Sequence, residues 1–318
     1  MRATIAGGSP DGIPTVGDRP EPQPGKGELL IQVRAAGLNN ADLLQVKGFY
    51  PPPPGWPPDI PGMELAGEVV ALGDGASRFA VGDRVMAVVG GGAQAELAVC
   101  HEREAMPIPD VLGWSEAGGF PEAFTTAHDA LFSQGQLAAG DRVCVHGAAG
   151  GVGTAGVALA AAAGAQVVAT VRRESARRDV ADLGAGVVAV EPEGFGAHGP
   201  FDVILELIGG PNLAADVAAL APGGRIVVIG VGAGATAEIN LLALMAVRGA
   251  IHASTLRARP LEGKAAAARL VEAHVLPLVA SGRLRIPIAA TFALEEAPAA
   301  YAAFAGGGKF GKVVLVKP

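Results

Sequence analysis

The expected fold is decided by the sequence VCVHGAAGGVG at residues 143–153, which is followed by an alanine-rich run to Gly164 and by VVATVRR at residues 167–173. Short, branched, apolar runs like those at the two ends are typical of buried parallel strands. Alanine strongly favours the helix, so the run between them indicates a helix. The segment thus predicts a strand, a glycine-rich turn, a helix and a second strand.

The glycine-rich turn has the spacing of a dinucleotide-binding fingerprint. Ala148, Gly150 and Gly153 occupy its three positions, with alanine in place of the first glycine. Gly150 would let the backbone approach a pyrophosphate, and Gly153 would let the helix pack closely on the sheet. Gly151 and Val152 would begin the helix, whose unpaired N–H groups would face the phosphates. We therefore expect a nucleotide site; the alternative is a turn that only packs the helix on the sheet.

The end of the second strand predicts which nucleotide binds. A free ribose 2′-hydroxyl usually meets an acidic residue there, whereas a 2′-phosphate needs a cation. Arg172 and Arg173 stand at the strand end, and Glu174 is the first carboxylate. A guanidinium can donate two hydrogen bonds to a phosphate. We expect NADPH rather than NADH, with a solvated basic helix start as the alternative.

Length and composition predict two domains with a large core. The 318 residues are 50% hydrophobic and 17% charged, and the net charge of -7 argues against general nucleic-acid binding. The two cysteines, Cys100 and Cys144, form neither a disulfide framework nor a metal-binding pattern, which fits a reducing cytoplasm. The N-terminal apolar run is too short for a signal peptide.

One uncharged stretch could be mistaken for a membrane span. No Asp, Glu, Lys or Arg occurs between Arg142 and Arg172. The stretch contains clustered glycines, Gln166 and β-branched runs at both ends, which a buried strand–helix–strand unit explains better than a bilayer helix. We therefore expect no membrane partner.

Short strand patterns bounded by turns recur through the first part of the chain. We expect an opening strand and hairpin within residues 1–27, and strands within residues 28–36, 60–70, 81–87 and 91–100. Asn39 or Asn40 would cap a short helix that ends at Gly48. This pattern predicts a compact β-barrel domain.

The pattern changes after Pro109. Ser115 would cap a short helix, and a longer helix would run from Pro121 to Phe132. Further strands are expected at residues 187–190, 201–207, 225–230 and 249–254, in alternation with helices. Such alternation predicts an α/β fold with a doubly wound parallel sheet and helices on both faces.

The last part of the chain is expected to return to the first domain. It contains a long helical segment at residues 260–281, a strand at 286–292, a helix at 294–304 and a strand at 311–316. We therefore expect a barrel domain of residues 1–119 and 257–318, and a nucleotide domain of residues 120–256.

Several further motifs occur in order along almost the whole chain. They are GLNNAD at residues 37–42, GFY at 48–50, IPGMELAGEV at 60–69, PEAFTTA at 121–127, APGGR at 221–225, STLRAR at 254–259 and GKVVL at 311–315. With the fingerprint, they resemble the zinc-free quinone oxidoreductases, the zeta-crystallin-like branch of the medium-chain dehydrogenase/reductase superfamily. The resemblance implies a GroES-like barrel, an inserted Rossmann domain and NADPH in the cleft between them. It also implies a homodimer or homotetramer formed through the strand near residues 249–254.

The zinc-dependent relatives hold a catalytic metal with Cys, His and Cys, and this chain departs from that pattern. Asn39 stands at the position of the first cysteine and Met63 at that of the histidine. The closely spaced cysteines of the structural zinc lobe are absent. The histidines, at positions 101, 128, 146, 198, 252 and 274, show no ligand spacing. We therefore expect no bound metal.

Without zinc, the substrate has to supply its own electrophilicity, because zinc polarises the substrate oxygen in the metal-dependent relatives. Quinones are electrophilic, and so are enones and enals; the protein then mainly orients the acceptor against the nicotinamide. We expect an NADPH-dependent quinone oxidoreductase, with an enone or 2-alkenal reductase as the first alternative. A nucleotide-binding protein with little turnover is the second alternative, and a zinc alcohol dehydrogenase is the third.

The resemblance also implies site residues. Asn39 and Tyr50 match substrate positions and can donate hydrogen bonds to a quinone oxygen, and Tyr50 could also donate a proton. Besides the glycine turn and the arginine pair, the cofactor would contact Thr126, Ser254 and Leu256 near the nicotinamide, Gly230, Val231 and Gly232 near the carboxamide, Ile208 and Gly209 near the adenosine, and Lys312 at the pyrophosphate. Lys312 could instead be an ordinary surface lysine. Asp42, Glu64 and His146 are interpreted as structural.

Overall fold

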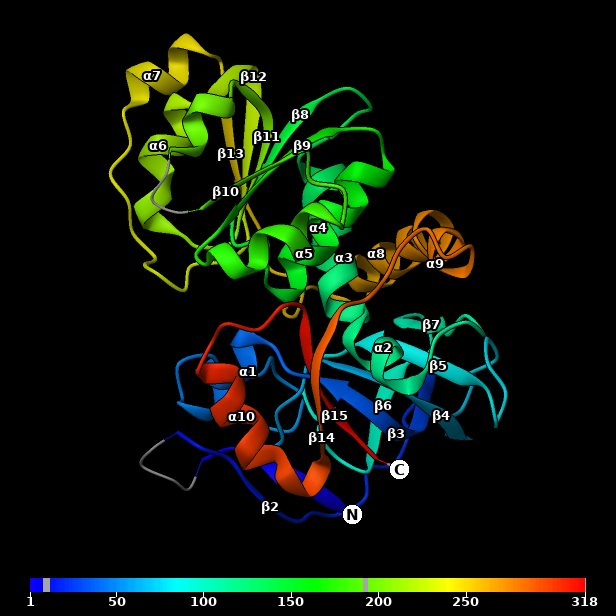
Figure 1. The fold of residues 1–318 in the computed structure, drawn as a ribbon. Coiled ribbons are helices and arrows are strands. Elements are labelled where there is room, and N and C mark those ends of the chain that lie inside the picture. The colour runs from blue at the N-terminus through cyan, green and yellow to red at the C-terminus, as the bar shows by residue number, and fades with distance from the viewer. Residues whose placement is uncertain (8–11, 191–193, 318) are drawn as a thin grey trace. The chain divides into compact units, whose positions relative to one another are not determined.

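The computed structural model describes residues 1–7, 12–190 and 194–317. The chain forms two compact units (Figure 1). Unit 1 contains residues 1–125, 256–282 and 286–318, and unit 2 contains residues 126–255 and 283–285. The end of the chain thus returns to the unit in which the chain begins.

The crossing from unit 1 to unit 2 lies within a helix. We expected it between residues 119 and 120, and it lies between Thr125 and Thr126, inside α3 (Pro121–His128). The first turn of α3 belongs to unit 1 because the backbone N–H of Glu122 donates to Oε2 of Glu64 at 2.8 Å. Helix α3 continues into a π-helical turn at residues 129–134.

Unit 1 is built on a seven-stranded sheet in the order β14-β15-β3-β4-β5-β7, with β6 paired to β3. Its strands are β3 (Glu28–Gly37), β4 (Glu64–Leu72), β5 (Arg84–Val88), β6 (Leu97–His101), β7 (Ala105–Pro107), β14 (Ile288–Ala293) and β15 (Lys312–Val316). Strands β14 and β15 are parallel, and the other pairs are antiparallel. A separate antiparallel hairpin joins β1 (Arg2–Ile5) and β2 (Thr15–Asp18). The strands expected in this unit are present, and β7 is additional.

The largely regular alternation of apolar and polar residues along β3 determines which face of this sheet packs against the core. Leu29, Ile31 and Val33 are buried, and the residues between them are partly exposed. They pack in one cluster with Leu65 and Val69 of β4. Burial of each such side chain contributes about 1.5–3 kcal/mol, so a shift of the register by one residue would be strongly unfavourable.

The helices of unit 1 correct two expectations. They are α1 (Asn40–Val46), α2 (Trp114–Gly119), α8 (Leu261–His274), α9 (Leu276–Ala280) and α10 (Ala297–Ala305). Ser115 lies inside α2 and does not cap it, because the extended residue at the N-cap is Gly113. The single helix expected at residues 260–281 is two helices. Pro277 lies in the first turn of α9, where its missing N–H cannot continue the hydrogen bonding of α8.

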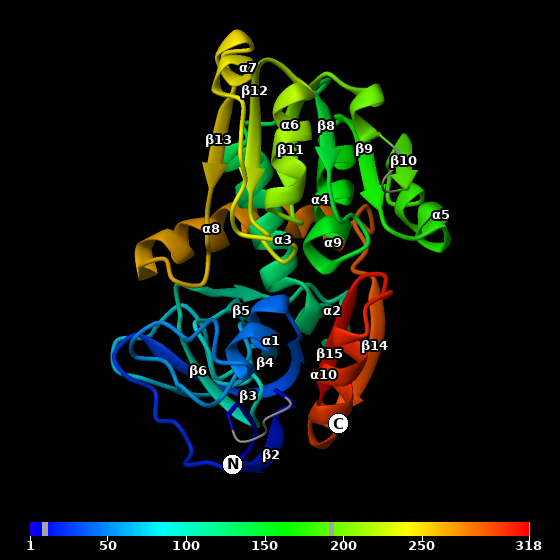
Figure 2. The same cartoon turned by 90° about the vertical axis from the view of Figure 1, so that its left-hand side faces the viewer.

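Unit 2 is a six-stranded parallel sheet in the order β10-β9-β8-β11-β12-β13 (Figure 2). Its strands are β8 (Arg142–Val145), β9 (Gln166–Val171), β10 (Val187–Val190), β11 (Phe201–Glu206), β12 (Leu220–Val228) and β13 (Ala250–Ala253). Helices α4 (Gly151–Ala162) and α5 (Arg177–Ala181) lie on one face, and α6 (Leu213–Ala218) and α7 (Leu241–Ala246) on the other (Figure 1). The strand order reverses direction at β8, as in the predicted doubly wound Rossmann sheet.

The uncharged stretch after Arg142 forms β8, α4 and β9, which is the predicted strand–helix–strand unit. Each strand is buried in the sheet, and α4 is nearly all apolar because it packs on that sheet. Among the described helices, none combines the length and the apolarity that a bilayer crossing needs.

Candidate functional site

The glycine turn joins β8 to the N-terminus of α4. Gly150 is the N-cap residue in an extended conformation (φ −78°, ψ 172°), and α4 begins at Gly151. Within the described chain, no side chain caps this end and no acidic residue lies in its first turn. The first N–H groups of a helix have no acceptor inside the helix, and the helix dipole adds a partial positive charge. This end of α4 is therefore suited to a phosphate group.

The two glycines of the turn are needed for different reasons. A Cβ on Gly153 would lie 2.4 Å from the carbonyl oxygen of Gly147 and 2.7 Å from the Cα of Ala148, so only glycine lets α4 pack this closely. A Cβ on Gly150 would meet the carbonyl oxygen of Gly147 at 3.5 Å, which is an ordinary contact. Packing within the protein thus does not require glycine at position 150. Its missing side chain leaves backbone open to a ligand, which favours a nucleotide site over a purely packing turn.

Two loops with expected cofactor residues follow neighbouring strands at their carboxyl ends, the edge where doubly wound sheets bind ligands. Ile208 and Gly209 follow β11, and residues 230–232 follow β12. Backbone hydrogen bonds join the loops, from Ala233 N to Ile208 O (2.9 Å) and from Gly210 N to Gly234 O (2.8 Å). The structure therefore brings these predicted residues together, along the edge that also carries the glycine turn.

Arg172 and Arg173 directly follow β9, and both are exposed. Neither guanidinium group forms a hydrogen bond or ion pair with another residue that the structure describes. Arg177, in contrast, lies 3.1 Å from Glu174 in an ion pair between Nε and Oε1. The guanidinium groups of the first two arginines are thus available to a phosphate at the end of β9.

Thr126, Ser254 and Leu256 have different surroundings. Thr126 is buried in α3, and Ser254 follows β13, where its N–H donates to Val228 O at 3.3 Å. Leu256 is buried in a small cluster of unit 1 with Val88 and Ala267. Their expected contacts with the nicotinamide remain predictions.

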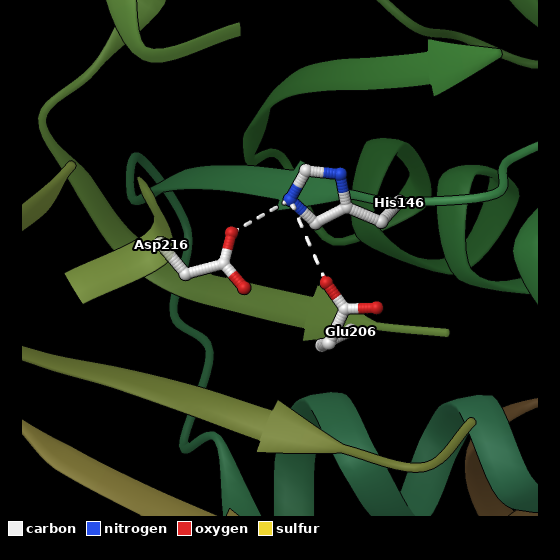
Figure 3. Close-up of side chains that lie close together, drawn as sticks. All are labelled: His146, Glu206 and Asp216. Carbon is white, nitrogen blue, oxygen red and sulfur yellow. Dashed lines mark hydrogen bonds and ion pairs between the residues drawn. The ribbon is translucent and has the colours of Figure 1, made fainter. Parts of the chain in front are cut away.

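A buried group of His146, Glu206 and Asp216 lies inside unit 2 (Figure 3). Nε2 of His146 lies 2.9 Å from Oδ1 of Asp216 and 4.0 Å from Oε2 of Glu206. Burial opposes a charge on His146, but the Cys144 sulfur and the bond to Asp216 raise its pKa well above the usual value. With Nδ1 held 3.0 Å from Oγ1 of Thr170, the ring is fixed on both sides. His146 therefore has the structural role that the sequence predicts.

Glu206 connects this group to the turn after β11. Its Oε1 accepts the N–H groups of Ile208 and Gly209, the latter at 2.7 Å, and its Oε2 accepts Nδ2 of Asn212 at 3.0 Å. Burial raises the pKa of Glu206, and the charge of His146 opposes that rise. Glu206 thus holds the backbone that is expected to contact the cofactor. Sequence reasoning missed this residue, although a carboxylate at the end of a buried strand was the available signal.

The same three side chains also satisfy a geometric requirement for metal binding. Of the residues that the structure describes, only His146, Glu206 and Asp216 bring three His, Cys, Asp or Glu ligand atoms within 4.8 Å of one another. His146 follows β8, Glu206 ends β11 and Asp216 lies in α6, so their spacing in the sequence does not reveal the group. Their contacts with one another and with the 208–209 backbone account for the arrangement.

In unit 1, Asn39 lies in a hydrogen-bonded network with Glu64 and Lys312. Nδ2 of Asn39 donates to Oε1 of Glu64 at 2.8 Å, and Oδ1 of Asn39 accepts from Nζ of Lys312 at 2.7 Å. The same Nζ donates to Oε1 of Glu64 at 2.5 Å and to the carbonyl oxygen of Leu38 at 2.9 Å. Glu64 is 0% and Lys312 is 3% exposed, so they form a buried ion pair.

This placement does not fit the expected contact between Lys312 and the pyrophosphate. A lysine ammonium has three N–H donors, and here each has an acceptor within the protein. The alternative, an ordinary surface lysine, is wrong as well because the side chain is buried. Lys312 and Glu64 are 248 positions apart, a separation across which local sequence patterns carry no information.

Tyr50 lies in a loop that Arg257 holds. Cζ of Arg257 lies 5.3 Å from the centre of the Tyr50 ring, and its Nη1 donates to the Tyr50 carbonyl oxygen at 3.5 Å. Arg257 also donates to Gly90 O at 2.7 Å and to Oε1 of Gln45 at 2.5 Å. Burial raises the pKa of Tyr50, and Arg257 opposes that rise. The hydroxyl is therefore protonated at neutral pH, as a hydrogen-bond donor must be.

Asp42 is fully buried beside Asn39 and has the structural role that the sequence predicts. Its carboxylate accepts the N–H groups of Asn39 at 2.8 Å and Gly62 at 3.1 Å. Burial raises its pKa from 3.8 to about 6, against the bond from Asn39 and the charges of Arg257 and Lys312. The carboxylate thus orders the start of α1 at a cost in stability when it is ionised.

We expect Asp42 to lower the free energy of unfolding as the pH rises from about 4 to about 6. The folded pKa lies above the unfolded one, so the folded protein holds the extra proton in this window and loses stability as that proton leaves. A shift from 3.8 to about 6 corresponds to at most about 3 kcal/mol. Asp42→Asn should remove this pH dependence. Urea unfolding of both proteins from pH 4 to 7 measures it, and a pH-independent difference between them would contradict the assignment.

Comparison with known proteins agrees with both units. The chain matches the alcohol dehydrogenase GroES-like domain over residues 25–134 and the zinc-binding dehydrogenase family over residues 164–315. It is 32% identical to the quinone oxidoreductase of Rattus norvegicus, over 97% of this chain and 95% of the relative. It is also 33% identical to a phenolphthiocerol/phthiocerol polyketide synthase of Mycobacterium tuberculosis, over 92% of this chain. The chain spans only 14% of the length of that synthase polypeptide.

Solved structures share the whole fold. The mycobacterial protein Rv1454c in complex with NADPH has a TM-score of 0.87 at 26% identity, with all of both chains covered. The quinone oxidoreductase of Pseudomonas syringae has a TM-score of 0.87 at 25% identity, with 99% of both chains covered. The GroES-like unit and the Rossmann unit of this chain match the fold of these structural neighbours. The chain belongs to the medium-chain dehydrogenase/reductase superfamily, in its quinone-oxidoreductase-like branch.

Proposed function

We propose that this protein is a zinc-independent NADPH:quinone oxidoreductase. The observation that carries the proposal is the network of Asn39, Glu64 and Lys312, which fixes an amide at the position of a metal ligand in the zinc-dependent relatives. The Asn39 amide has two hydrogens, and Glu64 takes one of them. In the part of the chain that the structure describes, the second has no acceptor, so it can donate to an acceptor oxygen that gains negative charge. A quinone oxygen gains such charge during reduction.

NADPH, when bound, supplies the hydride. We infer that the N-terminus of α4, Arg172 and Arg173 hold its phosphates, and that the loops after β11 and β12 contact the rest of it. Asn39 and the Tyr50 hydroxyl hold the acceptor oxygen and stabilise its developing charge. The proton that completes the hydroquinone comes from solvent. Rat and human relatives that are quinone oxidoreductases support the acceptor class, and the NADPH complex of a structural neighbour supports the cofactor.

A panel of acceptors tests this proposal. NADPH and NADH oxidation should be followed with benzoquinones, naphthoquinones, enones, 2-alkenals and saturated ketones, with metal analysis of the same preparation. Quinone turnover with NADPH and without stoichiometric metal supports the proposal. Tight NADPH binding without turnover of any acceptor would instead indicate a nucleotide-binding protein. Stoichiometric zinc together with alcohol oxidation would indicate a zinc alcohol dehydrogenase.

An enone or 2-alkenal reductase is the second candidate. The same Asn39 donor would serve it, because reduction of a conjugated C=C bond also places negative charge on the carbonyl oxygen. The chain is also similar to a polyketide synthase over almost its whole length. The panel should therefore test enones and enals as thoroughly as quinones. Turnover of enals without quinones would select this candidate.

The arginine pair should decide the choice of nucleotide. Arg172→Ala/Arg173→Ala should weaken NADPH binding about 30- to 100-fold, because bonds between a charged donor and a phosphate are worth about 1.5–3 kcal/mol. NADH binding should change less than about threefold, because it lacks the 2′-phosphate. Titration of both nucleotides by fluorescence measures this. The matched control is Arg283→Ala/Arg285→Ala, an exposed pair of unit 2 with the same change in charge. Equal losses for both nucleotides would mean that the pair does not read the 2′-phosphate.

We also propose that the protein is a homodimer that pairs along β13. In the described chain, β13 is an edge strand that pairs only with β12, and an unpaired edge is a template for another strand. The neighbouring helix α7 exposes Leu241 (62%), Leu242 (75%) and Met245 (68%). Apolar exposure of this kind beside a free edge marks an interaction surface.

Charges on α7 should therefore dissociate the dimer. Leu242→Lys/Met245→Lys places two ammonium groups in the proposed interface, and burial of unpaired charges is strongly unfavourable. Light scattering after gel filtration should show half the wild-type mass. Val81→Lys, which changes a side chain of unit 1 that is 63% exposed, should leave the mass unchanged. A wild-type protein that is already monomeric would rule out the proposal.

Both cysteines, Cys100 and Cys144, are buried and free. Burial raises the pKa of each thiol, which keeps it protonated and unreactive. Free thiols are typical of a reducing compartment, and we propose a cytoplasmic location.

A further inference from the structure

We propose that Lys312 is a positioning residue of the acceptor site, and that its buried ammonium makes Asn39 a stronger hydrogen-bond donor. The inference rests on the proposed function and gives Lys312 a role that its sequence motif does not reveal. It concerns a fixed positive charge, the Lys312 ammonium, that acts on the acceptor through the amide of Asn39.

The contacts of the ammonium fix the orientation of the amide. Oδ1 of Asn39 faces Nζ of Lys312 at 2.7 Å, and Nδ2 faces Oε1 of Glu64 at 2.8 Å. Turning the amide over would place its NH₂ group against the ammonium and its oxygen against the carboxylate. The ion pair therefore determines that Oδ1 of Asn39 faces Lys312 and that Nδ2 faces Glu64. Without such partners, the two orientations of an asparagine amide are hard to distinguish.

The same contacts change the strength of the donor. A cation at the carbonyl oxygen of an amide draws electrons away from its nitrogen, so the remaining N–H becomes a better donor. Hydrogen bonds in a chain strengthen one another in this way, by about 10–30% per bond. Water does little to screen the charge of the ammonium itself, because Lys312 is 3% exposed.

The backbone around the network is arranged to bring these groups together. Lys312 is the first residue of β15, which pairs with the end of β3, and Leu38 N donates to Val313 O at 2.8 Å. A Cβ on Gly37 would lie 2.3 Å from Oε1 of Glu64, so glycine at this position makes room for the carboxylate. Two strands from opposite ends of the chain thus place the ammonium against the start of α1.

A role in strengthening the donor has a consequence that a purely structural role lacks. Acceptors of low electrophilicity build up more charge on oxygen before the barrier is crossed, so they depend more on the donor. Loss of the ammonium should therefore slow weak acceptors more than strong ones. A loss of packing or stability would slow all acceptors by the same factor.

The test uses Lys312→Met and a matched control, Lys264→Met. Lys264 also forms a buried ion pair in unit 1, with Glu104; they are 7% and 4% exposed. Each variant removes one buried ammonium and leaves one buried carboxylate. kcat/KM is measured with quinones and enones that span a wide range of reduction potential. Lys312→Met should lose about 2- to 8-fold with the weakest acceptor, which is about 10–30% of the whole donor's effect on a logarithmic scale, and less than about twofold with the strongest. Lys264→Met should change all acceptors by one common factor.

A common factor for Lys312→Met as well, or no loss, would overturn the proposal. Lys312→Arg keeps the positive charge and should retain the wild-type dependence on acceptor strength, so a steeper dependence in this variant would also overturn it. The arginine variant carries the test alone if the methionine variant does not fold.

A second readout does not require turnover. The side-chain amide of Asn39 is followed by ¹H–¹⁵N NMR without acceptor, and its Nδ2 protons should shift upfield in Lys312→Met but not in Lys264→Met. If wild type reduces no acceptor, the proposed function fails, and the amide shift still decides whether Lys312 acts on Asn39. An unchanged amide shift in Lys312→Met would overturn the inference even in an active enzyme.

Discussion

Replacing Asn39 with alanine should lower kcat/KM for quinones about 100- to 1,000-fold, because loss of one donor to a developing oxyanion typically has an effect of this size. The amide N–H that is not bonded to Glu64 is the proposed donor. The KM for NADPH should change less than about threefold, since the proposed phosphate contacts do not include Asn39. Steady-state kinetics with saturating NADPH measure the loss.

The variant Asn39→Asp distinguishes the loss of the hydrogen-bond donor from the loss of side-chain volume. Aspartate has the same shape and can still accept a bond from Lys312, but it has no N–H, so this variant should lose about as much activity as the alanine variant. The matched control is Asn240→Ala, which removes another N-cap asparagine, bonded to Ala243 N at 3.1 Å. It should lose about 1 kcal/mol of stability and keep its quinone kinetics. Full activity of Asn39→Asp would show that Asn39 is not the donor.

The second large effect is expected at the glycine turn. Gly150→Ala should weaken NADPH binding about 10- to 100-fold and leave the thermal midpoint unchanged, because a methyl group there meets a ligand rather than the protein. Gly153→Ala should weaken binding and also lower stability by about 1–3 kcal/mol, because its Cβ would overlap the backbone of Gly147 and Ala148.

Calorimetric titration with NADPH and thermal unfolding distinguish the two variants. Gly196→Ala is the control, because a Cβ at this position of unit 2 would meet nothing within 4 Å. Both its affinity and its stability should match those of the wild type. An unchanged NADPH affinity in Gly150→Ala would mean that no phosphate approaches the turn at that residue.

Local patterns in the sequence were sufficient to predict most of the fold. The apolar runs and the glycine turn of residues 143–173 predicted β8, α4 and β9, and the alternation after Arg173 predicted the parallel sheet. The errors lie at helix ends. Ser115 is a good capping residue, but Gly113 already has the extended backbone of an N-cap. Pro277 divides a helical pattern that is otherwise continuous through residues 260–281.

The loops that are expected to contact the cofactor could be predicted from the sequence, but the side chains that support the candidate site could not. Ile208, Gly209 and residues 230–232 could be placed at the carboxyl ends of β11 and β12, because strands are visible in the sequence and ligand-binding loops of a doubly wound sheet follow its strands. The roles of Glu206, Arg257 and Lys312 were missed. Arg257 and Lys312 were each part of a quoted motif, but a motif does not show that a guanidinium supports the Tyr50 loop or that an ammonium faces Asn39.

The sequence by itself determined the architecture of this protein and predicted its candidate nucleotide site, because strand alternation, helix composition and glycine spacing depend on residues that are near neighbours in the chain. Only the tertiary structure showed the surroundings of Asn39 on the proposed acceptor side. Lys312 is 248 residues from Glu64 and 273 from Asn39, and only the pairing of β15 with β3 brings its charge to them. The effect of a buried cation depends on the groups that surround it, and the packing of the whole unit determines which groups those are.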